Sequence, residues 1–456
     1  MAIDHPAEEV ITRTRESHPN SDRQCGIRLR AFAQLGSESR QHVQAVAGTA
    51  SVNIAITAAG SIGGILLARA LGATHRGDLV AVLQWPIVIS SIASLGLAQA
   101  GCYWISKRPN QAASIISTAG IASVATGIII ALSGLLIAHL IGRDSQVILL
   151  MYVTFGLAPA YLVGGVSISA LQARSVFHWN VSRLVQPAVY LVGVGILFGE
   201  NRLNLMGAVS AFVLSVLLQT GYAFWRVRQA MGKLGRCRLS LLRPLYGYGS
   251  KLWLSDMPRL VNVRLDQLLL SVWSGVTAAS LGNYAVAVSL AALVLPISQA
   301  FGSVAFPRIA RSASEEHARR TERVTIVGAT ISSVVIVAVL AAFSSTIVPF
   351  VFGRQFSQAV GALWLLAPGA VFLSLNLVLA QVLQGRGRPL FTSVGEGIGA
   401  MSTIVLLLIL IPRFGIRGAA VASSIAYGVV TPFLFWGLRK DRAKASVESH
   451  AVAASG

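Results

Sequence analysis

One apolar stretch of the sequence carries side chains that could do chemistry inside a membrane. Residues 251–275 (KLWLSDMPRLVNVRLDQLLLSVWSG) are long enough to cross a bilayer. The stretch contains four charged residues: Asp256, Arg259, Arg264 and Asp266. Each charge in hydrocarbon costs at least about 2.5–3.5 kcal/mol on insertion scales, so such a helix normally faces a bundle interior or a water-filled cavity. We therefore expect this stretch to line a cavity.

Arg264 is the first candidate for binding an anion. At the rise of an α-helix it lies about 20 Å from Lys251, near the membrane midplane. Its planar fork of donors suits phosphate oxygens, and the alternative is a structural contact with another helix. Arg259 is a second cavity cation, although Asp256 lies three residues before it and the two could pair on one helix face.

Three acids could bind a coupling proton or sodium ion. Asp266 cannot pair with Arg264 directly, because residues two apart point to different sides of a helix. It could instead tie the two halves of the protein together. Glu396 lies among glycines that allow close approach of another backbone or a ligand, and the alternative is a hydrogen-bonded glutamate inside the second half. Asp256, nearer the membrane surface, is the third candidate.

Three further residues are candidates for contacting a substrate. Arg69 lies at the end of the first apolar segment, and Asn53 and Asn376 lie inside apolar segments. Their amide groups could hydrogen-bond sugar hydroxyls or could instead connect neighbouring helices.

The composition is that of a polytopic membrane protein. Of the 456 residues, 54% are hydrophobic and 12% charged, against about 25% charged in soluble domains. A net charge of +20 fits basic loops held against an anionic leaflet, and we expect no nucleic-acid partner.

The apolar runs predict an all-α fold with twelve membrane spans. They are expected at residues 45–68, 79–105, 112–141, 146–172, 181–199, 204–225, 251–274, 280–305, 324–352, 357–384, 389–412 and 416–437. With the N-terminus inside, 27 Lys and Arg residues fall in inside segments and seven in outside segments. This asymmetry predicts that both termini are cytoplasmic.

The longest inside loop divides the chain into two six-helix lobes. We expect a cytoplasmic tail (1–43), an N-lobe (44–228), a linker (229–250), a C-lobe (251–438) and a second cytoplasmic tail (439–456). Gly77-Asp78 and Gly282-Asn283 mark equivalent positions, each after an outside turn, which predicts a parallel repeat with a pseudo-two-fold axis along the membrane normal. The first span lacks charge until Arg69, so most of the cavity charge should come from the second lobe.

The sequence predicts a transporter rather than an enzyme. The three cysteines and eight histidines form no metal-ligand spacing, catalytic triad or HExxH motif, and there is no Walker loop. We expect no catalytic residues, no metal and no cofactor beyond a coupling H+ or Na+.

Several segments carry a resemblance to a known family. They are LLARALGATHRGDL (66–79), RLDQLLLSVWSGVTAASLGNYAVAVSL (264–290), AFGSVAFPRIARSA (300–313), IVPFVFGRQFSQAVGALWLLAP (347–368) and LIPRFGIRGAAVASSIAYG (410–428). With these segments the chain resembles the polysaccharide-transporter branch (O-antigen and lipid-linked oligosaccharide flippases) of the multidrug/oligosaccharidyl-lipid/polysaccharide (MOP) superfamily.

The resemblance implies two lobes around a central cavity that opens alternately to either side of the membrane. The implied cargo is a polyprenyl-diphosphate-linked oligosaccharide, carried across the bacterial inner membrane, with glycosyltransferases or a polymerase of the same pathway as possible partners. A drug/cation antiporter of the same fold is the main alternative. Twelve rather than fourteen helices disfavour a lipid II flippase, and the short loops disfavour a membrane-embedded polymerase or glycosyltransferase.

Overall fold

The computed structural model describes residues 19–232, 235–310, 312 and 314–455. The chain divides into two units, Met1–Ser51 and Val52–Gly456, and the second holds everything discussed below. The described residues form α-helices joined by four short 3₁₀-helices. The α-helices are α1 (Pro19–Ala93), α2 (Leu97–Lys107), α3 (Ala112–Ile141), α4 (Ser145–Gly156), α5 (Ala158–Arg174), α6 (Val176–Gly199), α7 (Leu205–Met231), α8 (Leu242–Val272), α9 (Ala278–Ala291), α10 (Leu295–Ala310), α11 (Glu315–Ala342), α12 (Ser344–Val351), α13 (Ser357–Gly385) and α14 (Pro389–Ser455).

These helices account for the twelve predicted spans. Nine helical segments of the described chain are long and apolar enough to cross a membrane. Two of them, within α1 and α14, each contain two helices joined at a glycine with non-helical backbone, Gly72 and Gly415, which makes eleven. The twelfth is α8, a helix of membrane-spanning length that carries four charges between residues 256 and 266. The all-α, two-lobe architecture predicted from the sequence is therefore confirmed.

The boundaries of the second and fifth spans differ from the prediction. The second span begins directly after Gly72 rather than at residue 79, and it is interrupted before α2 by Leu95 and Gly96. The fifth span, α6, begins at Val176, where the side chain of Ser175 accepts a hydrogen bond from the backbone N–H of His178. It therefore begins before the predicted start at residue 181.

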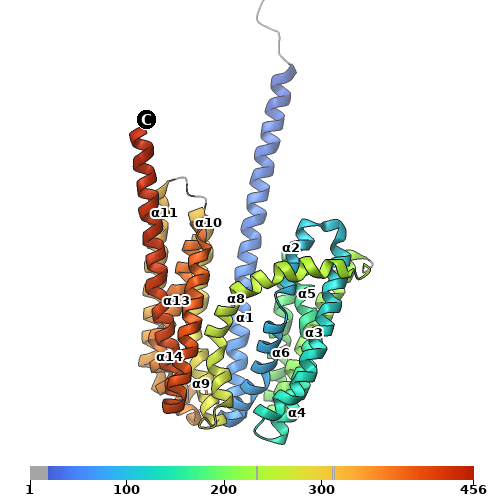
Figure 1. The fold of residues 1–456 in the computed structure, drawn as a ribbon, viewed down its shortest axis with the longest axis vertical. Helices are drawn as coiled ribbons and strands as arrows, with labels where there is room; N and C mark the ends of the chain where they lie inside the picture. The colour runs from blue at the N-terminus through green and yellow to red at the C-terminus, as the bar shows by residue number, and fades with distance from the viewer. Residues whose placement is uncertain (1–18, 233–234, 311, 313, 456) are drawn as a thin grey trace, which may run out of the picture. The chain divides into compact units, whose positions relative to one another are not determined.

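Both lobes are built on buried apolar clusters, and the turns define two ends of the bundle. At the Gly72 end lie the turns at Gly72, 142–144, 200–204 and 273–277; at the Arg386 end lie those at 108–111, 235–241 and 386–388. The N-lobe contains α1 (from Val52) to α7, and the C-lobe contains α9 to α14 (Figure 1).

Helix α8 belongs to both lobes. Its first turns cross the Arg386 end of the N-lobe, where Leu245 is buried among α2, α3 and α5, and its second half descends beside α9 (Figure 1). Pro258 lies inside α8, and a proline removes one backbone hydrogen bond and bends a helix. The predicted span at 251–274 is thus the second part of a longer helix.

The lobes meet at the Gly72 end through two glycines related by the predicted repeat. A Cβ atom on Gly77 would overlap the carbonyl oxygen of Ala278, and a Cβ atom on Gly282 would overlap that of Ala73. Each of these carbonyls lies four residues before the opposite glycine. This reciprocal contact is what a two-fold axis produces, and small residues allow the backbones to approach closely.

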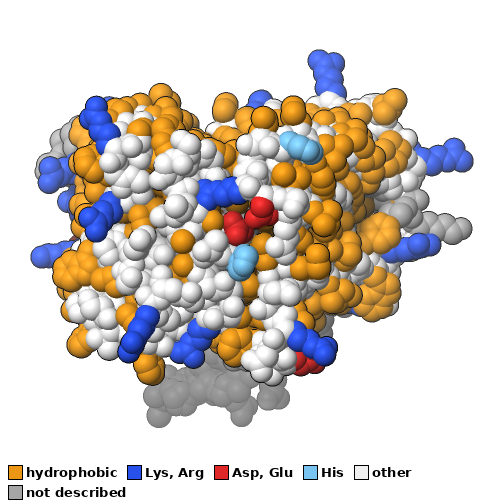
Figure 2. Space-filling view, turned by 90° about the horizontal axis from the view of Figure 1, so that it is seen from below, with side chains coloured by type: hydrophobic (Ala, Val, Ile, Leu, Met, Phe, Trp, Pro, Cys, Tyr) orange, Lys and Arg blue, Asp and Glu red, His pale blue; other side chains and the backbone are white. Residues whose placement is uncertain are grey.

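Two arginines add hydrogen bonds between the lobes at the same end. Arg69 donates to the carbonyls of Phe350 and Val351 at 2.6 and 2.7 Å, and Arg143 donates to that of Val276 at 2.7 Å. Figure 2 looks onto this end and shows side chains filling the middle of the face, with charged groups among them. The Gly72 end is thus closed between the lobes.

The Arg386 end of the C-lobe is held by a buried ion cluster. Arg386 donates to Glu322, to Glu315 at 2.9 Å and to Asp441 at 3.1 Å, and Arg442 pairs with Glu322 at 2.7 Å. Burial alone would lower the pKa of Arg386, but the hydrogen bonds to Glu322 and Glu315 raise it overall. The cluster joins α11, the turn before α14 and the part of α14 at Asp441 and Arg442 into one body.

Replacing Gly282 should force the lobes apart at the Gly72 end. We expect Gly282→Val to lengthen the distance between spin labels at Ser145 (N-lobe) and Gln358 (C-lobe), both exposed, by several ångströms, because the valine side chain occupies the place of the Ala73 carbonyl. Gly275→Val is the control, since a Cβ atom there meets only the edge of Trp273. An unchanged label distance in Gly282→Val would contradict the close contact.

Removing Glu322 should destabilise the C-lobe. Its carboxylate is fully buried between Arg386 and Arg442, and breaking a buried pair from one side costs about 3–5 kcal/mol. Glu322→Ala should therefore lower the melting temperature in detergent strongly, whereas Glu316→Ala, an exposed glutamate on the same helix, should leave it nearly unchanged. Equal melting temperatures for the two variants would refute this account.

Candidate functional site

A cavity of about 450 Å³ lies between the N-lobe and α8. Its N-lobe wall comes from α1, α2 and α5, and its other wall comes from one face of α8. The lining residues are Ser90, Ser91, Ser94, Gly96, Ala98, Gln99, Tyr161, Leu162, Gly165, Trp253, Asp256, Met257, Arg259, Leu260, Val263 and Arg264.

At the break between α1 and α2, the N-lobe wall of the cavity contacts α8 directly. Gly96 has a φ of 70°, and a Cβ atom on it would overlap the carbonyl oxygen of Gly249 on α8. Both the backbone conformation and the contact therefore require glycine. Trp104 on α2 donates to the carbonyl of Pro244 at 3.1 Å, which fixes the first turns of α8 on the N-lobe.

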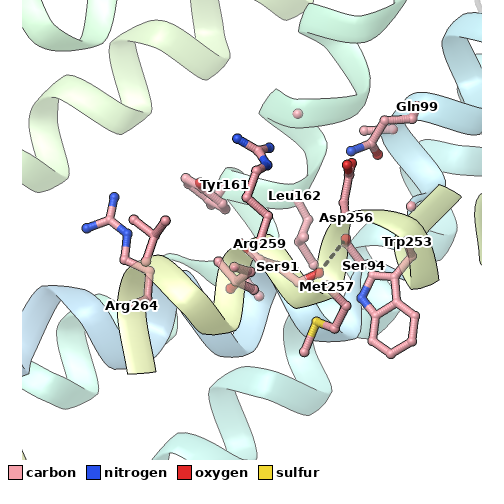
Figure 3. Close-up of a pocket in the computed structure, with 16 residues that line it drawn as sticks. Ser91, Ser94, Gln99, Tyr161, Leu162, Trp253, Asp256, Met257, Arg259 and Arg264 are labelled. Carbon is pink, nitrogen blue, oxygen red and sulfur yellow. Dashed lines mark hydrogen bonds between the residues drawn. The ribbon is translucent and has the colours of Figure 1, made fainter. Parts of the chain in front are cut away.

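Three charged side chains of α8 project into the cavity without protein partners. Figure 3 shows Asp256, Arg259 and Arg264 extending from the same side of the helix, toward the wall that carries Gln99 and Tyr161. Within the described chain, none of the three charged groups makes a hydrogen bond or ion pair, so the pairing of Asp256 with Arg259 allowed by their spacing does not form. Their charges are available to a ligand.

The opposite wall is polar but neutral. Ser91 and Ser94 hydrogen-bond to carbonyls of their own helix, at Ile87 and Ser91, at 2.8 and 2.9 Å. These serines, Gln99 and Tyr161 were not among the site residues predicted from the sequence. Ser90, Ser91 and Ser94 are spaced as one helix face in an apolar segment, and this is the signal that could have found them.

Glu396 belongs to a hydrogen-bond network inside the C-lobe. The buried side chain of Asn262 donates to a Glu396 carboxylate oxygen at 2.9 Å and accepts from Thr403 at 3.0 Å. The hydroxyl of Tyr427 donates to the backbone carbonyl of Asn262 at 2.8 Å. Glu396 is only half-buried, so this network reaches from the C-lobe core to an accessible carboxylate.

Asp266 is buried in the C-lobe on the other side of α8 from the cavity. It accepts a hydrogen bond from the hydroxyl of Tyr284 at 2.6 Å and one from the backbone N–H of Gln267 at 2.7 Å. Within the described residues, no three His, Cys, Asp or Glu side chains lie close enough together to hold a metal ion. Asp266 and Glu396 therefore share a lobe but sit in separate hydrogen-bond groups.

The remaining three predicted site residues do not line the cavity. Arg69 holds the lobes together at the Gly72 end. The side chain of Asn53 accepts from Arg183 at 2.7 Å. Asn376 donates to the carbonyl of Tyr427 and accepts from Thr431 inside the C-lobe. In this conformation Arg69, Asn53 and Asn376 therefore connect neighbouring helices by hydrogen bonds.

Comparisons with known proteins agree with the fold. The family described as polysaccharide biosynthesis protein matches residues 43–313. An uncharacterized membrane protein of Methanocaldococcus jannaschii is 26% identical over 242 residues, covering 51% of this chain and 47% of its own length. The probable low-salt glycan biosynthesis flippase of Haloferax volcanii is 24% identical over 243 residues, covering 53% and 50%. The chain thus spans about half the length of these curated relatives.

Two solved structures have the same arrangement of helices. The lipid II flippase MurJ in an inward closed conformation has a TM-score of 0.73 at 13% identity, covering 88% of this chain and 90% of that one. An inward-facing multidrug resistance MATE transporter of the MOP superfamily has a TM-score of 0.68 at 16% identity, covering 85% and 95%. These likenesses establish the two-lobe fold.

The hydrogen bond to Asp266 should be needed for stability. Tyr284→Phe removes the hydroxyl and leaves a buried carboxylate oxygen without it, which should cost about 1–3 kcal/mol. Tyr190→Phe is the matched control, because the buried hydroxyl of Tyr190 makes no hydrogen bond to the described residues. Thermal unfolding in detergent measures both, and the prediction fails if Tyr190→Phe lowers the melting temperature as much as Tyr284→Phe.

Proposed function

The chain belongs to the polysaccharide biosynthesis protein family, and from this premise we propose that it is a flippase for a lipid-linked oligosaccharide. The cargo would be an oligosaccharide joined through a diphosphate to a polyprenyl lipid. It would pass through the cavity between the N-lobe and α8, where the unpaired Arg259 and Arg264 face neutral polar groups.

The observation that carries the proposal is the pair of unpartnered arginines on α8. Arg259 and Arg264 lie five residues apart on the cavity side of one helix. A guanidinium offers donors in a fixed fork that matches phosphate oxygens, and hydrogen bonds between ions are about twice as strong as those between neutral groups. A diphosphate presents oxygens enough for both arginines, while Ser91, Gln99 and Tyr161 are suited to hydroxyl groups of a sugar.

The direction of transport is inferred from charge and from the closed end. Lys and Arg residues concentrate at the Arg386 end, which supports assigning that end to the cytoplasmic face of a cell membrane. The Gly72 end would then face outward and is closed by the contacts of Gly77, Gly282 and Arg69. Cargo would enter from the cytoplasmic side, and its release would need those contacts to separate.

Coupling to an ion gradient is proposed at the C-lobe acids. Glu396 is the better placed of the two, since it is half-buried and hydrogen-bonded to Asn262, whereas Asp266 is enclosed with Tyr284. A proton or Na+ on Glu396 would change the charge beside Asn262 on α8, the helix that carries the cavity arginines. Transport driven by a pH gradient or by a Na+ gradient in proteoliposomes distinguishes the two ions.

A drug/cation antiporter is the second candidate on the same fold. A cavity for organic cations favours acids and aromatic faces, but this one has two arginines against the single acid Asp256. Accumulation of lipid-linked oligosaccharide on the inner leaflet after depletion would support the flippase. Sensitivity to cationic drugs without such accumulation would support the antiporter.

Replacing Arg264 should abolish export without affecting membrane insertion. Loss of charge-assisted hydrogen bonds worth about 1.5–3 kcal/mol should weaken cargo binding by roughly ten- to a hundredfold in Arg264→Ala. Arg264→Lys should retain only part of the activity, because lysine keeps the positive charge but lacks the planar fork of donors.

The readout is lipid-linked oligosaccharide on each leaflet, in a strain that depends on the variant, with protein levels measured in the same membranes. Arg202→Ala, at an exposed arginine in the turn before α7, is the control. Normal export by Arg264→Ala would remove Arg264 from the cargo site.

A further inference from the structure

A second hollow of about 370 Å³ lies on the N-lobe, apart from the cavity. It is lined by Ile116, Ser117, Gly120, Ile121, Val124, Val163, Val166, Ser167, Phe224, Gly235 and Cys237. On α5 its residues are Val163, Val166 and Ser167, whereas the cavity uses Tyr161, Leu162 and Gly165. The two hollows therefore lie on different faces of α5.

This hollow opens onto the membrane-facing surface near the Arg386 end. Ile121 and Val124 at its edge are 56% and 40% exposed. They continue into the exposed apolar face of α3 at Ile128 and Ile129. Because α3 is a membrane span, such a face contacts lipid chains. The hollow is thus an indentation in the lipid-contacting surface.

The segment that closes the hollow at the Arg386 end is basic. Gly235 packs against the first turn of α3, and the backbone N–H of Arg238 donates to Thr118 at 3.0 Å, which holds residues 235–238 in place. The side chains of Arg236 and Arg238 are exposed and make no hydrogen bond or ion pair with the described residues.

The N-lobe offers these cations no acidic partner nearby. Its three acids, Asp78, Asp144 and Glu200, all lie at the opposite Gly72 end. In addition, the Oγ atom of Ser117 inside the hollow is buried and has no hydrogen-bond partner among the described residues. Since buried polar groups are nearly always hydrogen-bonded, this hydroxyl calls for an acceptor from outside the described chain.

We propose that this hollow binds one anionic phospholipid. An acyl chain would lie against Gly120, Val166 and Phe224, and the phosphate would contact Arg236 and Arg238. A lipid ester carbonyl could accept from Ser117. The arrangement of an apolar slot, a donor nearer the Arg386 end of the slot and two free cations beyond it matches the order of groups along a phospholipid, from chain to ester to phosphate.

A phospholipid fits better than the transported lipid. The diphosphate of the cargo belongs with Arg259 and Arg264 in the cavity, and α5 separates the cavity from this hollow. The proposal is therefore independent of the proposed function, and it concerns a site occupied in the surrounding bilayer.

Cys237 provides a reporter in the hollow, because it is exposed and lines it. In a Cys25→Ser/Cys102→Ser background it is the only thiol. The protein would be placed in nanodiscs of phosphatidylcholine with and without phosphatidylglycerol, and the rate of Cys237 modification by a water-soluble maleimide measured. At about 1 kcal/mol for each of the two arginines, phosphatidylglycerol should slow the modification roughly thirtyfold.

Two variants separate the chain from the headgroup. A Cβ atom on Gly120 meets open space, so Gly120→Leu should fill the slot without strain and abolish retention of lipid in native mass spectrometry. Gly195→Leu, at a glycine that is equally open but lies on α6, should retain it. Arg236→Gln/Arg238→Gln should keep a bound lipid but remove the preference for phosphatidylglycerol over phosphatidylcholine.

Three results would overturn the proposal. One is an equal rate of Cys237 modification with and without phosphatidylglycerol. Another is lipid retention by Gly120→Leu equal to that of Gly195→Leu. The third is an undiminished preference for phosphatidylglycerol in Arg236→Gln/Arg238→Gln. Slow modification in every bilayer, unchanged by the arginine substitutions, would instead place a segment of the protein in the hollow.

Discussion

Charge inside a membrane span is costly, at about 2.5–3.5 kcal/mol or more for each group, and α8 carries four charges within eleven residues. The surrounding helices are arranged so that none of these four charged side chains faces lipid alone. Arg259 and Arg264 face the cavity, and Asp266 is enclosed with Tyr284 of α9. This requirement explains why α8 lies between the lobes, why it contacts both α2 and α14, and why a cavity exists beside it.

The closed end depends on a different constraint, the close approach of two backbones. Gly77 and Gly282 occupy equivalent positions of the two halves and contact each other's helices reciprocally, so neither can accept a larger side chain without parting the lobes. Arg69 reinforces the contact by donating to carbonyls at the end of α12, where helix carbonyls lack intrahelical partners. Ala68, Ala73 and Val80 of α1 also belong to the apolar cluster of the C-lobe, so separating the lobes here would expose apolar surface as well as break hydrogen bonds.

The sequence was sufficient to predict features set by local composition and spacing. The apolar runs, the basic loops and the repeated glycines predicted the two-lobe fold, the resemblance of several segments indicated the family, and the charges of α8 predicted a cavity. Features that depend on contacts distant in sequence were not predictable. The break at Gly96 exists because Gly249 packs there, and Asn53 and Asn376 are occupied by Arg183 and Tyr427. These partners lie on other helices, so residue spacing within one helix does not predict them.

The asymmetry of the cavity connects its two walls to the movement of the lobes. The N-lobe wall is neutral, and the α8 wall has two cations with one acid. While the cavity is open, water solvates Arg259 and Arg264, but closing the Arg386 end would remove that water and leave a net positive charge at low dielectric. A bound anion would neutralise the arginines before closure. Under the proposed function, an anionic cargo would lower the free energy of closing the cavity, and the two arginines proposed to bind it would hold the empty protein open.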